Sequence, residues 1–146
     1  MEWGDMRGSC SCGAVMYEVD RLDMPILHCH CVTCRKTHSA PFAPTAGVGR
    51  EHFRWLAGED KLSSYESSPR KLRRFCSKCG SHLVAERASQ PHVVLRVATL
   101  DEDPGERPRA HIWTSHDVSW LGYCEGVPSY ASMPSPEQID RGPSSR

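Results

Sequence analysis

Seven residues from His28 to Cys34, HCHCVTC, contain three cysteines and two histidines. Thiolate and imidazole groups are the ligands that zinc prefers in proteins, so this segment predicts a metal site. Three thiolates fill three of the four positions of a tetrahedral ion. A protein ligand in the fourth position would make the site structural, whereas water or a substrate there would make it reactive.

The sequence offers several candidates for that fourth position. His28 and His30 adjoin the cysteines, but a ring next to a bound cysteine must fold back sharply to reach the same ion. Hydrogen-bonding or surface roles are therefore favoured for both. Cys124 has no metal-type spacing and is expected to be a small buried apolar residue. Water and a substrate remain the other candidates.

A second metal site is indicated by FCSKCGSHL, residues 75–83. Cys76 and Cys79 stand three residues apart, as in a zinc knuckle, and Gly80 follows at a position that often needs a positive φ. A knuckle supplies only two thiolates. Two more ligands must come from elsewhere in the chain.

The segment CSCG offers such a pair in Cys10 and Cys12. In a regular strand these two side chains would lie too far apart to share one ion without a bend. Gly8 and Gly13 flank the pair and allow that bend. The resulting closed, structural site would be formed by Cys10, Cys12, Cys76 and Cys79.

The length and charge of the chain limit its classes of partner. A chain of 146 residues is long enough for one domain. Lys plus Arg and Asp plus Glu number 18 each, so the net charge is zero and gives no general electrostatic case for a nucleic-acid partner.

No apolar run approaches the roughly 18 residues that a membrane-spanning helix needs. The beginning of the chain lacks the pattern of a signal peptide, and a cytoplasmic location is expected. The chain has eight cysteines, and in a reducing compartment the clustering of seven of them favours metal binding over disulfides.

Alternating apolar side chains predict a mainly-β domain of short antiparallel strands. Strands are expected over residues 15–19, on either side of a turn at Gly58 within residues 52–68, and leading into Cys76. A hairpin is expected over residues 81–87 and 92–100, and a further strand over 109–115. Frequent prolines allow only short helical turns, near the middle cysteines and around residues 116–121. The inward side chains of the segment 52–68 are expected to be Phe53, Trp55, Leu62 and Tyr65.

The domain is expected to span residues 1–130, followed by a Pro- and Ser-rich tail over 131–146. The tail has almost no apolar periodicity. A flexible or surface-wrapping segment is therefore expected there.

Three segments taken together resemble the glutathione-dependent formaldehyde-activating enzyme family, which also includes the centromere protein V group. They are GSCSCGAVMYEV, CHCVTCRKTHSAPF and RRFCSKCGSHL, and the resemblance covers residues 8 to about 120. It implies a β-tent fold with two zinc ions, of which the second can be lost. The structural zinc falls on Cys10, Cys12, Cys76 and Cys79, and the second zinc falls on Cys29, Cys31 and Cys34. The family usually has two small residues shortly after the CRK segment. Ser39 and Ala40 occupy these positions here. His38, which precedes them, is expected on the surface.

The resemblance implies a carbon–sulfur lyase that adds a zinc-activated thiol, glutathione or a similar one, to formaldehyde or a related aldehyde. Cys29, Cys31 and Cys34 would hold the reactive zinc, and Arg35 and Lys36 are candidate contacts for the glutathione carboxylates. The basic run over residues 70–74 is expected to be a solvated face or strand edge. The alternatives are a non-catalytic zinc-stabilised binding module and, with less support, redox sensing by the middle cysteines.

Overall fold

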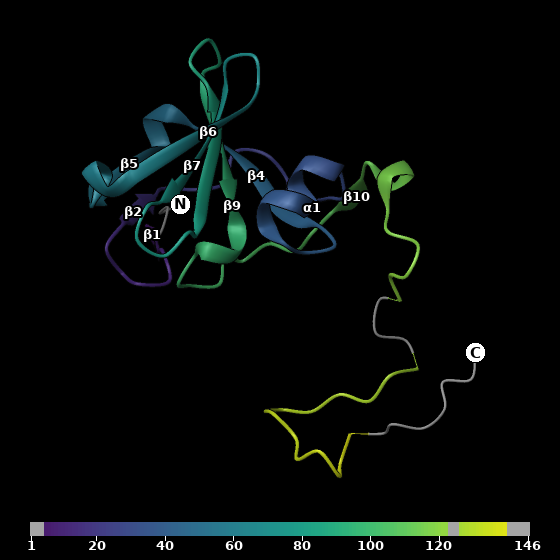
Figure 1. The fold of residues 1–146 in the computed structure, drawn as a ribbon. Helices are drawn as coiled ribbons and strands as arrows, with labels where there is room; N and C mark the ends of the chain where they lie inside the picture. The colour runs from purple at the N-terminus through teal and green to yellow at the C-terminus, as the bar shows by residue number, and fades with distance from the viewer. Residues whose placement is uncertain (1–4, 123–125, 140–146) are drawn as a thin grey trace.

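The structure is a computed structural model that describes residues 5–122 and 126–139 (Figure 1). Strands make up most of its regular structure, so the predicted mainly-β class is confirmed. The strands are β1 Met6–Ser9, β2 Met16–Val19, β3 Leu27–Cys29, β4 Ala43–Gly49, β5 Phe53–Ala57, β6 Leu62–Ser68, β7 Lys71–Cys76, β8 His82–Arg87, β9 His92–Arg96 and β10 Ala110–Ile112. The helices are α1 Val32–His38 and the 3-10 turns η1 Arg50–His52, η2 Glu59–Lys61, η3 Val97–Thr99 and η4 Thr114–His116.

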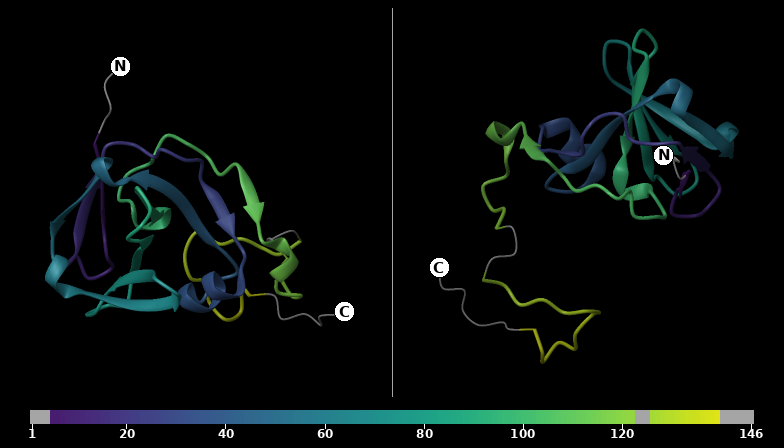
Figure 2. Two further views of the ribbon diagram at one scale, coloured as in Figure 1. Left: turned by 90° about the horizontal axis from the view of Figure 1, so that it is seen from above. Right: turned by 180° about the vertical axis from the view of Figure 1, so that it is seen from behind.

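Two sheets organise these strands. The larger has the order β10-β3-β4-β9-β8-β7-β6, and the smaller has the order β1-β2-β5. Figure 1 shows the small sheet at one end of the body, with α1 and the edge strand β10 of the large sheet at the other end. The pairing is antiparallel, as predicted, except between β3 and β10, which run parallel. This exception arises because the chain crosses the molecule before it returns to the edge beside β3 (Figure 2).

The segment on either side of Gly58 forms two strands, as predicted, but they join different sheets. β5 pairs with β2, and β6 pairs with β7. Phe53, Trp55 and Leu62 pack against the core. The inward placement predicted for Tyr65 is wrong, because this side chain lies on the edge strand β6 and is 51% exposed.

The other predicted strands and helical turns are found close to their expected positions. β8 and β9 form the expected antiparallel hairpin, and η3 replaces the end of the second predicted strand. α1 follows the middle cysteines, and η4 lies near the second expected turn. β1, β3 and β4 were not predicted. Proline is uncommon inside a sheet because it cannot donate a ladder hydrogen bond. Pro44 nevertheless lies opposite His28 in the ladder between β3 and β4.

The hydrophobic core fills the space between the two sheets. Tyr17 of β2 is fully buried, stacks on Phe53 with ring centroids 5.3 Å apart, and its hydroxyl lies 2.7 Å from the Thr99 hydroxyl. Cys10 and Cys76 belong to the same buried cluster. Two of the predicted structural ligands are therefore part of the main core.

The last described segment leaves the sheets. Residues 126–139 contain no helix or strand and run away from the body of the molecule in Figures 1 and 2. Their apolar side chains Val127 and Met133 are 59% and 87% exposed.

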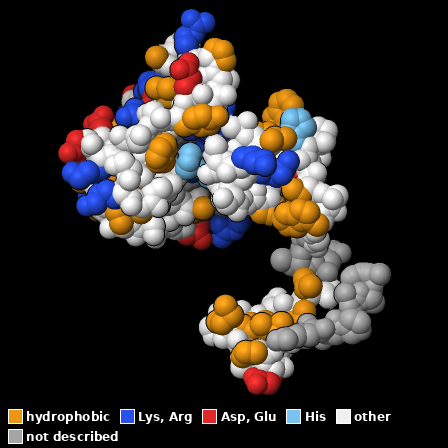
Figure 3. All heavy atoms as spheres, viewed as in Figure 1, with side chains coloured by type: hydrophobic (Ala, Val, Ile, Leu, Met, Phe, Trp, Pro, Cys, Tyr) orange, Lys and Arg blue, Asp and Glu red, His pale blue; other side chains and the backbone are white. Residues whose placement is uncertain are grey.

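In the described ranges, no helix is long and apolar enough to cross a membrane. Figure 3 shows charges of both signs scattered over this face of the sheets, in keeping with the balanced composition.

Candidate metal centres

The first candidate metal centre brings together Cys10, Cys12, Cys76 and Cys79. Their sulfur atoms all lie within 4.8 Å of one another. The Sγ atoms of Cys10 and Cys12 are 3.7 Å apart, and those of Cys12 and Cys76 are 3.9 Å apart. Metal–sulfur bonds of about 2.3 Å in a tetrahedron separate neighbouring sulfurs by about 3.8 Å. The four thiols therefore have the spacing that a closed tetrahedral site requires.

Local turns bring each pair of cysteines together. After β1, the Gly13 amide donates to the Cys10 carbonyl over 3.0 Å, and Gly13 has a φ of 80°. After β7, the Gly80 amide donates to the Cys76 carbonyl over 2.8 Å, and Gly80 has a φ of 83°. The predicted positive φ at Gly80 is confirmed. Gly8 has a different role from the predicted one, since a Cβ atom there would lie 2.2 Å from the ring of Tyr17.

Polar groups around this cluster favour the thiolate form that binds metal. The Ser11 amide donates to the Ser81 hydroxyl over 2.9 Å, and that hydroxyl lies 3.3 Å from the Cys79 sulfur. Hydrogen bonds from the Ser81 side chain and backbone lower the pKa of Cys79 to about 5. The Val15 amide donates to Cys10 over 3.3 Å. Ser81 thus links the turn after β1 to the turn after β7.

The second candidate metal centre consists of Cys29, Cys31 and Cys34, whose sulfur atoms also lie within 4.8 Å of one another. Cys29 ends β3, and Cys31 is the N-cap of α1, where its sulfur accepts a hydrogen bond from the Cys34 amide over 3.3 Å. Cys29 and Cys34 are buried, and Cys31 is half-buried. In the described residues, this group holds three ligand atoms. Cys124 lies outside the described residues.

The two histidines beside these cysteines have other partners, as predicted. His30 is fully buried; its Nδ1 contacts Asp117, and its Nε2 lies 2.8 Å from Nδ1 of His111. His28 stacks on Phe42, with ring centroids 4.2 Å apart. Neither imidazole belongs to the group of metal-ligand atoms. Through Asp117 and His111, His30 ties the segment around β10 and η4 to the three-cysteine loop.

A cavity of about 230 Å³ lies beside Cys31. Its wall comes from α1, β6, β7, β8 and the segment around η4, and it contains several basic side chains. The lining residues are Cys31, Thr33, Ser67, Ser68, Lys71, Arg73, Arg87, Trp113 and His116. The cavity thus joins one sulfur of the three-cysteine group to a cationic wall.

The basic side chains that line this cavity are not the ones predicted to contact glutathione. Arg35 is half-buried and Lys36 is exposed, and neither lines the cavity. Lys71 and Arg73 do line it, because alternate residues of β7 point to the same face of the sheet. The interpretation of this run as a solvated edge is therefore wrong for these two residues. Arg87 was missed, since its position opposite Lys71 depends on the pairing of β7 with β8.

Positive charge also lies beneath the three cysteines. Arg73 and Arg96 are 3% and 4% exposed, and Arg73 Nη1 lies 3.8 Å from the Cys34 sulfur. A hydrogen bond from Cys29 and the positive charge of Arg96 lower the pKa of Cys34 to about 4. The same hydrogen bond raises the pKa of Cys29. The positive charges of Arg73 and Arg96 therefore favour the thiolate form of Cys34.

His38 is not the surface residue that was expected. It is half-buried, and its ring centroid lies 5.0 Å from that of His82. Burial, followed by the charge of Arg96, lowers the pKa of His38 to about 3. Its imidazole is therefore neutral at physiological pH.

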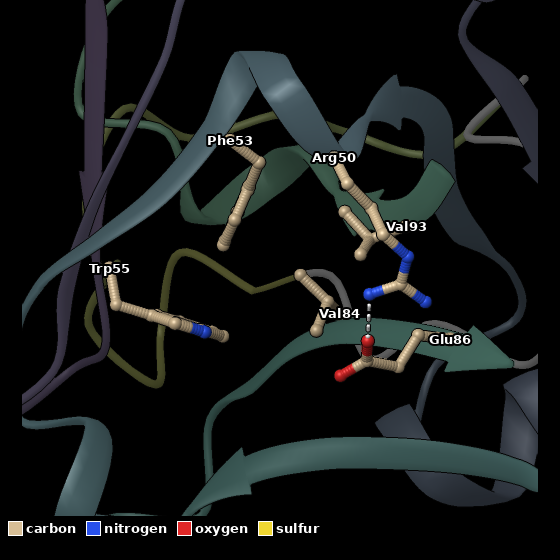
Figure 4. A pocket seen from close by; sticks show the side chains of 6 residues that line it. All are labelled: Arg50, Phe53, Trp55, Val84, Glu86 and Val93. Carbon is tan, nitrogen blue, oxygen red and sulfur yellow. Dashed lines mark hydrogen bonds and ion pairs between the residues drawn. The ribbon is translucent and has the colours of Figure 1, made fainter. Parts of the chain in front are cut away.

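A smaller cavity of about 160 Å³ lies between β5 and the large sheet (Figure 4). Phe53, Trp55 and two valines line it, and the ion pair between Arg50 and Glu86, 2.7 Å long, closes one side. None of these lining residues carries a thiol or an imidazole. The cavity beside Cys31 is therefore the better candidate for thiol chemistry.

The fold and the two cysteine clusters define a class of protein, a mainly-β domain with two groups of thiols that can each hold a metal ion. A sequence profile described as glutathione-dependent formaldehyde-activating enzyme matches residues 5–116. The chain belongs to this family.

Two similar proteins were found, one by sequence and one by structure. A Halomonas elongata protein named for the same family is 29% identical over 124 residues, which cover 80% of this chain and 79% of the relative. A crystal structure of a Rhodobacter sphaeroides protein is 30% identical and superposes with a TM-score of 0.58, covering 70% of this chain and 98% of that chain. The similarity to the solved structure therefore supports the fold.

Proposed function

We propose that the protein is a zinc-dependent carbon–sulfur lyase that joins a thiol, glutathione or a similar one, to formaldehyde or a related small aldehyde. The observation that carries this proposal is the position of Cys31, which belongs to the three-cysteine group and also lines a cationic cavity. Family membership and the name of the Halomonas relative support glutathione and formaldehyde as the substrates.

Zinc suits both candidate centres, because soft thiolate ligands in a tetrahedral arrangement select it over harder cations. Cys10, Cys12, Cys76 and Cys79 would hold a structural ion, and Cys29, Cys31 and Cys34 would hold the reactive one. Zinc held by these three cysteines would lower the pKa of a thiol in the fourth position, so that the sulfur would lose its proton to a base and stay nucleophilic. Three thiolate ligands weaken zinc as a Lewis acid for water, so thiol chemistry suits this donor set better than hydrolysis.

The cavity residues would bind and orient glutathione. Its carboxylates would pair with Lys71 and Arg87, while its sulfur points toward Cys31. Trp113 covers part of the cavity wall and would exclude water from the reacting atoms. Binding of this kind gives the thiol and the aldehyde a fixed geometry, which is a major source of rate enhancement.

The reaction needs one carbon–sulfur bond and one proton. The sulfur adds to the aldehyde carbon, the carbonyl π bond breaks, and the oxygen takes up a proton to give an S-hydroxymethyl adduct. His116 lines the same cavity, and its buried Nδ1 has no hydrogen-bond partner among the described residues. We assign His116 as the group that takes up the proton lost by the thiol and delivers it to the oxygen, and that carries it from the oxygen back to the sulfur in the reverse cleavage.

A non-catalytic binding module is the alternative. It requires a fourth protein ligand in the three-cysteine site and a surface that carries the function. Family membership and the cavity beside Cys31 favour the enzyme over this alternative.

The glutathione site can be tested with two matched lysine variants of the zinc-loaded protein. Lys71→Gln removes a charge from the cavity wall and should weaken glutathione binding about tenfold, the loss expected for one charge-assisted hydrogen bond. Lys36→Gln removes an exposed charge outside the cavity and should leave the affinity unchanged. Isothermal titration calorimetry measures both. Equal affinities in the two variants would contradict the assigned cavity.

A further inference from the structure

Two arginines near the three-cysteine group are buried and have no carboxylate partner among the described residues. Arg73 and Arg96 are 3% and 4% exposed, although arginine is rarely buried to this extent unless it is paired. Other arginines of the protein form ion pairs, such as Arg54 with Glu18 and Asp20. Within the described ranges, no ion pair involves Arg73 or Arg96. A buried charge without a counter-charge strongly destabilises a fold, so both guanidinium groups call for a nearby anion.

The three cysteines are the groups that can supply this negative charge. Arg73 donates through Nε to the Ser67 hydroxyl over 2.8 Å and places Nη1 3.8 Å from the Cys34 sulfur. Arg96 lies opposite Thr45 in the ladder between β4 and β9 and interacts electrostatically with all three cysteines. Its Nε atom is buried and has no hydrogen-bond partner in the described part of the chain. The two arginines therefore approach the cysteine group from two neighbouring regions of the large sheet.

Other charged groups near the site do not balance these arginines. Lys71 and Arg87 in the cavity wall add further positive charge. Asp117, the carboxylate that contacts the three-cysteine loop, lies against His30 and forms no ion pair with either arginine in the described residues. His38 and His82 have pKa values lowered by burial and then by Arg96, and both are neutral at physiological pH. The surroundings of the cysteine group are therefore cationic.

The charge balance of the loaded site follows from these neighbours. Three thiolates and one divalent ion carry one net negative charge. The guanidinium groups of Arg73 and Arg96 add two positive charges, so the site and the two arginines together carry one net positive charge. A neutral fourth ligand leaves that positive charge buried, whereas an anionic ligand cancels it.

We propose that Arg73 and Arg96 are specificity-determining counter-charges, which make the second metal centre prefer an anionic sulfur ligand to a neutral fourth ligand. This inference rests on the proposed function. It assigns the two arginines a task different from that of Lys71, which would contact the carboxylates of glutathione. The substrate class is then defined by two separate features, a thiolate beside the buried arginines and an anionic group at the cavity wall.

Cobalt-loaded protein allows a direct test, because thiolate ligands give cobalt a characteristic absorption. The probes are 2-mercaptoethanol, which has no carboxylate, and imidazole, which is a neutral ligand. Arg96→Gln should weaken binding of 2-mercaptoethanol by about tenfold to hundredfold, as expected for one charge several ångströms away at an effective dielectric constant of about 20. Binding of imidazole should not weaken. Arg96→Lys, which keeps the charge, should restore most of the thiol affinity. Lys36→Gln, which removes an exposed charge outside the cavity, should change neither affinity.

The outcomes separate this inference from the proposed function. Equal losses for both probes in Arg96→Gln, or no loss for either, would overturn the role of the arginines while the open site stands. Binding of neither probe by the wild-type protein would overturn the open site itself and the inference with it. If Arg96→Gln does not retain cobalt, Arg73→Gln gives the same comparison, because it removes the other buried charge.

Discussion

Replacement of Cys79 with serine should unfold most of the domain. The loss follows from the position of the four-cysteine centre, which joins the turn between β1 and β2 to the turn between β7 and β8 and so ties the two sheets together. Structural zinc contributes about 10–16 kcal/mol in small zinc domains, whereas a whole domain is stable by only about 5–15 kcal/mol. Circular dichroism and thermal melting of the purified variant measure the effect.

A neighbouring substitution gives the control for this variant. Lys78→Ala lies in the same turn and removes an exposed side chain outside the group of sulfur ligands, so its melting curve should match that of the wild type. Chelation of the metal from the wild-type protein should reproduce the unfolding seen in Cys79→Ser. A native-like melting transition in Cys79→Ser would contradict the structural role of the closed centre.

Cys31→Ser should have the opposite combination of effects, with a folded domain, about one zinc fewer per chain and no detectable lyase activity. Cys29, Cys34 and Ala43 form a small buried cluster apart from the main core, so loss of the second ion should cost the fold little. Serine is also a good N-cap residue and can keep α1 in place. Consumption of formaldehyde in the presence of glutathione, combined with zinc analysis, measures both changes.

Val32→Ala is the matched control on the same helix. Val32 is 45% exposed and is not among the cavity-lining residues, so this variant should keep its zinc and its activity. If Cys31→Ser unfolded to the same extent as Cys79→Ser, the division between a structural and a reactive centre would be wrong. Full activity in Cys31→Ser would contradict the reactive role of the three-cysteine site.

The cysteine groups could be predicted from the sequence because short local turns set the spacing of the cysteines. Cys76 and Cys79 are brought together by one turn, and Gly80 completes that turn with a positive φ, so neighbouring residues determine the geometry. The same holds for Cys29, Cys31 and Cys34, which lie within six residues of one another. Alternation of apolar and polar side chains likewise located β2, because the period of two is a local property of a strand. Richness in valine and leucine located β8 and β9.

The features that sequence reasoning missed depend on how distant strands pair. The cavity wall combines Lys71 and Arg87, which meet only because β7 and β8 adopt one register. Tyr65 has the spacing of an inward residue, but β6 is the last strand of its sheet and leaves it exposed. Arg96 ends an apolar strand, and its sequence neighbours give no sign that it faces the cysteines. The contact between His30 and Asp117 joins residues from opposite ends of the domain.

The most direct test of the account is X-ray absorption at the zinc edge, with zinc counted per chain, before and after addition of glutathione. One closed and one open centre predict two zinc ions per chain. The mean number of sulfur ligands per zinc should rise from about 3.5 to about 4 when glutathione binds. Two zinc ions with an unchanged sulfur shell in the presence of saturating glutathione would contradict the central claim that the three-cysteine centre takes a substrate thiol as its fourth ligand.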